Sequence, residues 1–97
     1  MRNNAQAALA KTVKEKEEGG DYDGALEVLG QYVEAAGATF AKKLRSAVYA
    51  NRAATLVKAE DWREAVRVLK TACEEFPRER NFRTSMKQCE RRLAESD

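Results

Sequence analysis

Apolar and polar positions follow each other along most of the chain with the spacing of amphipathic helices. After Tyr22, apolar residues recur every three or four positions, at Ala25, Leu26, Leu29 and Val33. Near the C-terminus the same spacing places Phe82, Met86, Cys89 and Leu93 on one narrow stripe among charged and polar neighbours. Such a period is that of one face of an α-helix. With one proline and five glycines, the chain also lacks the turn residues that many short strands need.

Capping and helix-breaking residues divide this pattern into five predicted helices. Asn3 or Asn4 begins the first helix and Gly19-Gly20 ends it, since glycine is common just beyond helix ends. Gly37 ends the second, and Pro77 prevents the fourth from continuing. The predicted bounds are about 5–18, 22–36, 40–59, 62–75 and 79–95. The fold class is therefore all-α.

Part of the chain repeats itself at an offset of 40 residues, because residues 20–29 align with residues 60–69. Each copy carries an aspartate suited to cap a helix, then an aromatic residue, an alanine and apolar positions. In the second copy Glu64 follows Asp61 by three residues, as in a capping box. The predicted repeating unit is a helix, a tight turn and a second helix.

The stretch from Ser46 to Pro77 resembles a tetratricopeptide repeat. The family's alternating large and small positions and its proline are matched by Tyr49, Ala53, Leu56, Ala65, Leu69, Ala72 and Pro77. The first copy fits less closely: Leu9, Ala25 and Leu29 match, whereas Val13, Lys16, Tyr32 and Gly37 depart from the pattern. The extra residues between Gly37 and Ser46 indicate added N-terminal turns on the third helix, carrying Phe40 and Leu44.

The resemblance implies a right-handed α-α superhelix in a single domain, residues 1–97. Its parts are repeat one over about 5–36, repeat two over about 40–76 and a capping helix over about 79–95. In this family the first helix of each pair lines a concave groove. A solvating final helix suits such an array, because the last repeat would otherwise leave its apolar face in water.

Charge is sorted by helix class, although the net charge is only +2. Residues 1–20, 38–58 and 77–97, the groove class, hold 15 basic and 7 acidic residues. The remaining residues hold 3 basic and 9 acidic ones. Any solvated helix carries charge, but this sorting favours a basic concave surface that attracts acidic peptides or a C-terminal carboxylate.

The family's geometry also implies which residues face the groove. They are Lys11, Lys14, Ala47, Ala50, Asn51, Ala54, Lys58, Gln88 and Arg91. The three alanines form a low floor for a peptide, or are simply good helix formers packed against neighbours. Residues 49–53 are most similar to the co-chaperone branch, whose carboxylate clamp holds the acidic C-terminal tails of cytosolic heat-shock chaperones. Only Asn51 of the five clamp positions is kept; the others fall on Ala10, Lys14, Asn81 and Ser85.

We therefore expect a protein-protein interaction module, a scaffold or co-chaperone-like adaptor that binds a protein or peptide. The alternative is a structural or assembly subunit acting through oligomerisation, since two repeats are fewer than a stable array usually has. A third hypothesis, RNA binding by the arginine-rich last helix, is disfavoured by the interleaved Glu79, Glu90 and Glu95.

The sequence contains few residues suited to catalysis or to cofactor binding. The chain has no histidine, and its glycines form no phosphate-binding loop. Cys73 and Cys89 do not form a CxxC motif, so we expect two reduced, buried thiols, with a disulfide or redox switch as the alternative. The sequence predicts no enzyme, no metal and no cofactor. Because no apolar stretch reaches about 20 residues, it also predicts no membrane segment and a cytoplasmic or nuclear protein.

Overall fold

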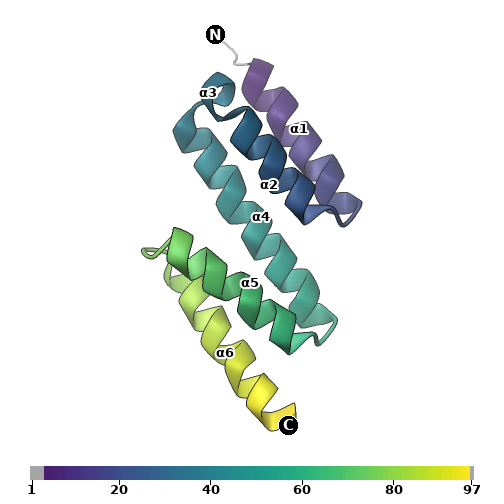
Figure 1. Ribbon diagram of the computed structural model, residues 1–97, viewed down its shortest axis with the longest axis vertical. Coiled ribbons are helices and arrows are strands. Elements are labelled where there is room, and N and C mark those ends of the chain that lie inside the picture. Colours follow the sequence, from purple (N-terminus) through teal and green to yellow (C-terminus); the bar gives the residue numbers. More distant parts are fainter. Residues whose placement is uncertain (1–3, 97) are drawn as a thin grey trace. The chain divides into compact units, whose positions relative to one another are not determined.

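Helices account for all the regular structure in the part of the chain that the computed structural model describes, residues 4–96 (Figure 1). They are α1 (Asn4–Glu18), α2 (Tyr22–Gln31), α3 (Val33–Ala36), α4 (Ala38–Lys58), α5 (Trp62–Glu75) and α6 (Arg80–Ser96). No strand occurs between residues 4 and 96, so the all-α class is confirmed. Asn3, one of the two predicted starts of the first helix, lies outside the described residues.

The predicted second helix over 22–36 is wrong in one respect, because it is interrupted at Tyr32. The backbone of Tyr32 adopts φ −111° and ψ 17°, which separates α2 from the single turn α3. Gly30, two residues before the break, is a weak helix former and lowers the cost of leaving the helix there. In the sequence, Tyr32 and Val33 lie three and four positions after Leu29, which is the spacing of a continuous helix. The periodicity of the sequence therefore does not predict the interruption.

The two tight turns of the repeat have the same hydrogen bonds at the predicted offset. In the first turn Gly20 N–H donates to Glu17 O at 3.0 Å and Asp21 N–H donates to Lys16 O at 2.8 Å. In the second turn Glu60 N–H donates to Val57 O at 3.0 Å and Asp61 N–H donates to Leu56 O at 2.9 Å. This pair of bonds is the Schellman motif, which requires a left-handed residue. Gly20 (φ 79°) and Glu60 (φ 59°) occupy that position.

Both predicted N-caps are confirmed. Asp21 accepts a hydrogen bond from Gly24 N–H at 2.9 Å, and Asp61 accepts one from Glu64 N–H at 3.4 Å. The reciprocal half of the expected capping box does not form, because the Asp61 N–H is already bonded to Leu56. Glu64 instead pairs with Arg67 and, at 3.9 Å, with Arg52 of α4. The hydrogen bond from Arg67 is the main reason that the pKa of Glu64 is lowered.

The chain divides into two compact units between Val48 and Tyr49, within α4. The first unit packs α1, α2, α3 and the beginning of α4 around one core. Its buried members are Leu9, Val13, Ala25, Leu29, Ala36 and Val48. Phe40 and Leu44, from the added turns of α4, pack against this core. A hydrogen bond of 2.8 Å from Gln6 Nε2 to Ala36 O also joins α1 to the end of α3.

The second unit consists of the rest of α4 with α5 and α6. Ala65 and Ala72 of α5 are completely buried, and Leu69 is 1% exposed. Three buried aromatic rings join the helices: Phe76 lies 6.1 Å from Tyr49 of α4 and 6.1 Å from Phe82 of α6, between ring centroids. The Tyr49–Phe76 pair is edge-to-face, with an interplanar angle of 69°, an arrangement that adds to the hydrophobic contribution of burial; the Phe76–Phe82 pair is tilted at 43°. They hold α4 and α6 to the end of α5.

Two glycine-to-alanine substitutions in the first unit should change stability in opposite directions. Gly20→Ala places a Cβ in open space but at φ 79°, so we expect the free energy of unfolding to fall by about 1 kcal/mol. Gly30→Ala also meets open space, but within α2, and should raise it by about 0.5–1 kcal/mol. Urea denaturation followed by circular dichroism measures both. Equal shifts of the same sign would contradict the left-handed turn at Gly20.

Candidate functional site

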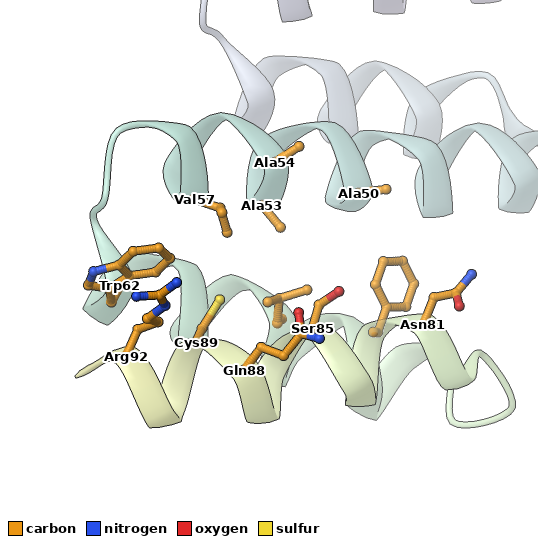
Figure 2. Close-up of a pocket in the computed structure, with 12 residues that line it drawn as sticks. Ala50, Ala53, Ala54, Val57, Trp62, Asn81, Ser85, Gln88, Cys89 and Arg92 are labelled. Carbon is orange, nitrogen blue, oxygen red and sulfur yellow. The ribbon is translucent and has the colours of Figure 1, made fainter. Parts of the chain in front are cut away.

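The second unit contains a groove of about 410 Å³ between α4 and α6, with α5 at its base (Figure 2). Eight of its twelve lining residues are apolar: Ala50, Ala53, Ala54, Val57, Trp62, Leu69, Phe82 and Cys89. The other four are Asn81, Ser85, Gln88 and Arg92, all from α6. A concave apolar surface with a few polar groups on one side is the usual form of a binding site.

The α4 wall is low because it is built almost entirely of alanine. Ala50, Ala54 and Val57 are spaced at one helical turn and are exposed to solvent. Val57, with 37% of its surface exposed, is one of only two large apolar side chains that stand out among the described residues. Figure 2 shows the side chains of Val57 and Ala53 directed toward α6. Small side chains leave room for another backbone to lie close to the helix.

The α6 wall is polar and uncharged over most of its length. Asn81, Ser85 and Gln88 follow one another at spacings of four and three residues, so they share one face of the helix. Amide and hydroxyl groups donate and accept hydrogen bonds, which suits the backbone of a bound segment. This wall therefore suits a peptide of any sequence whose backbone N–H and C=O groups are free to form hydrogen bonds.

A cation–π pair lies at one end of the groove (Figure 2). The Arg92 guanidinium carbon lies 5.9 Å from the centroid of the Trp62 ring. An arginine over an indole face at this distance is attracted by the ring quadrupole. Arg92 is also the single charged residue lining the groove, so any preference of the groove for a carboxylate has to come from this end.

The predicted groove residues are divided between the two units. Ala50, Ala54 and Gln88 line the groove of the second unit. Asn51, Lys58 and Arg91 belong to the same unit and are exposed, but they do not line this groove. Lys11, Lys14 and Ala47 belong to the first unit, where all three are exposed.

Sequence reasoning found three of the twelve lining residues, and Val57, Trp62 and Arg92 are among the nine that it missed. The spacing held a signal for two of them. Val57 continues the row of Ala50 and Ala54, and Arg92 continues that of Asn81, Ser85 and Gln88. Trp62 does not belong to either row. It is half-buried and contributes both to packing and to the groove.

A second hollow of about 470 Å³ lies in the first unit, between α1 and the α2–α3 segment. Its lining has no charged residue and consists of Ala5, Ala8, Leu9, Thr12, Val28, Gln31, Tyr32 and Ala35. Tyr32, at the break between α2 and α3, is 54% exposed, an unusual value for a large ring. This hollow is apolar but has no polar wall comparable to that of α6.

The described residues contain few groups suited to metal binding or thiol chemistry. Residues 4–96 contain no group of three or more histidine, cysteine or acidic side chains that could hold a metal ion. Within the same range, no helix combines the length and apolarity needed to cross a bilayer. Both cysteines are free; Cys89 is buried as expected, whereas Cys73 is only half-buried, because it stands beside the buried face of α5.

Comparison with known proteins gives no relative for this chain. No protein-family model matches it, and no curated protein or solved structure does. The interpretation of the groove therefore rests on its geometry and on the residues that form it.

Thiol labelling should report on the base of the groove. Cys89 is 3% exposed, and burial raises the pKa of its thiol. A raised pKa means less of the reactive thiolate at a given pH. In a Cys73→Ser variant, Cys89 should therefore react at least about tenfold more slowly in the folded protein than in urea, and should need a higher pH. In a Cys89→Ser variant, the half-buried Cys73 should react faster. Equal rates for Cys89 in folded and unfolded chains would contradict its burial.

Proposed function

We propose that this chain is a protein-protein interaction module of the tetratricopeptide type, which binds a peptide segment of a partner in the groove between α4 and α6. The observation that carries the proposal is the groove itself: an exposed row of small side chains faces a row of amides and a hydroxyl. The first row accommodates a peptide's bulk and the second its backbone hydrogen bonds.

The repeat supports the family assignment within this proposal. Helix pairs α1–α2 and α4–α5 are each joined by a Schellman turn followed by an aspartate N-cap, 40 residues apart. Positions that the resemblance requires to be small, Ala53, Ala65 and Ala72, are all buried. The groove walls are α4 and α6, the helix class that lines the concave surface in this family. We extend the proposal to a right-handed superhelix on this basis.

The proposed activity is binding and not catalysis, in the cytoplasm or nucleus, as a scaffold or co-chaperone-like adaptor. The preferred partner segment is acidic or presents its C-terminal carboxylate, which Arg92 at the Trp62 end of the groove would attract. A chaperone C-terminal tail is one such segment. It would have to bind without the family's clamp, of which only Asn51 is present.

Oligomerisation stays as the second candidate function, favoured by the uncharged hollow of the first unit. An exposed apolar ring such as Tyr32 beside an apolar depression is the kind of surface that proteins bury in assemblies. Light scattering over a range of concentrations tests it. A mass that rises with concentration, and falls back to that of one chain in a Tyr32→Ser variant, would support assembly.

A bulky side chain introduced into the groove should weaken the binding of a peptide there. Peptides selected from a random display library on the immobilised chain would be titrated by fluorescence anisotropy against two variants. Ala54→Phe places a ring in the groove and should weaken binding by roughly tenfold, about 1.4 kcal/mol. Ala94→Phe adds the same ring at an exposed position of α6 outside the groove and should change affinity less than about twofold.

Unaltered affinity in the Ala54→Phe variant, with native helicity by circular dichroism, would exclude the groove as the binding site. A library that yields no binder at all would count against the proposed function as a whole.

A further inference from the structure

Helix α6 presents three different faces, and the groove uses only one of them. At 3.6 residues per turn, the residues of α6 fall into three separate arcs. Asn81, Ser85, Gln88 and Arg92 form the groove face. Phe82 and Cys89, both buried, mark the face packed in the core. The third face points away from both and carries Arg80, Arg83, Lys87 and Arg91.

These four residues, here named the basic stripe, lie within an arc of about 80° and are all exposed. From Arg80 to Arg91 the stripe extends about 16 Å along the helix axis. Its successive members stand three or four residues apart, so each is the helical neighbour of the next. Like charges at this spacing destabilise a helix by about 0.2–0.5 kcal/mol per pair. A purely solvating surface would avoid three such pairs in succession.

The acidic residues beside the stripe do not neutralise it. Glu90 follows Lys87 by three positions and Glu95 follows Arg91 by four, spacings that allow ion pairs. Among the described residues, however, neither glutamate forms an ion pair with a member of the stripe. The one contact of the stripe is a 3.5 Å hydrogen bond from Arg83 to Pro77 O, which leaves the positive charge uncompensated.

We infer that the basic stripe Arg80, Arg83, Lys87 and Arg91 is a second interaction surface, which docks an acidic segment of a partner protein. Carboxylates spaced as on a helix, at intervals of three or four residues, would meet each cation in turn and relieve the repulsion along the stripe. This surface is separate from the groove, so the inference holds whether or not the groove binds a peptide.

The surroundings of the stripe favour a protein partner over a nucleic acid or a membrane. A nucleic acid carries a charge on every nucleotide and would meet Glu90 and Glu95 on the two flanks. It would also find no ring to stack on, because Phe82 is 6% exposed and belongs to the packed face. No large apolar side chain is exposed on the described part of α6, as a membrane-inserting helix would require. A protein segment can place neutral residues against the two glutamates.

The test compares two triple variants with the same net charge. Arg83→Gln/Lys87→Gln/Arg91→Gln removes most of the stripe, while Lys43→Gln/Arg63→Gln/Lys70→Gln removes three exposed cations elsewhere. The probe is a labelled helical peptide of about 12 residues with glutamates at positions 1, 4, 8 and 12, titrated at about 50 mM salt. We expect roughly tenfold weaker binding for the stripe variant and less than about twofold for the control.

Several results would overturn the inference. They are no binding of the glutamate peptide by the native chain, equal weakening by both triple variants, or a similar loss in the Ala54→Phe groove variant. Tighter binding of an oligouridylate with four phosphodiesters, lost in the stripe variant, would reassign the stripe to RNA. Failure of library peptides to occupy the groove would refute the proposed function while leaving the stripe result unaffected.

Discussion

The contact of Phe76 with Tyr49 and Phe82 is the constraint on which the second unit depends. Phe76 follows α5 directly, and its ring meets one aromatic ring from α4 and one from α6. All three rings are buried, so moving any one of them would expose a large apolar surface. Because α4 and α6 are also the walls of the groove, the same contact fixes the distance between those walls.

Alanine has two opposite roles in this small protein. Ala25 and Ala65 are completely buried in the second helix of each pair, where a small side chain lets the neighbouring helix pack closely. Ala50 and Ala54 are exposed on α4, where the same small size creates a groove. A larger residue at a buried position would strain the core, whereas one at an exposed position would fill the proposed site.

The faces of α6 show how one short helix can support more than one interaction. Its apolar face is fixed by the core, which sets the direction of the other two faces. The polar face then completes the groove with α4, and the basic stripe is left facing solvent. Any partner of the stripe and any peptide in the groove would approach from different directions, so the two proposed interactions do not compete for the same residues.

The sequence by itself determined the helices, because their signals are local. The caps at Asp21 and Asp61 and the turns at Gly20 and Glu60 depend on hydrogen bonds between residues at most five positions apart. Tertiary structure decided what depends on packing between distant residues. It paired Glu64 of α5 with Arg52 of α4, and it brought Trp62 of α5 and Arg92 of α6 together at the end of the groove. Such outcomes follow from which side chains meet across helices, and periodicity along one helix carries no information about its neighbours.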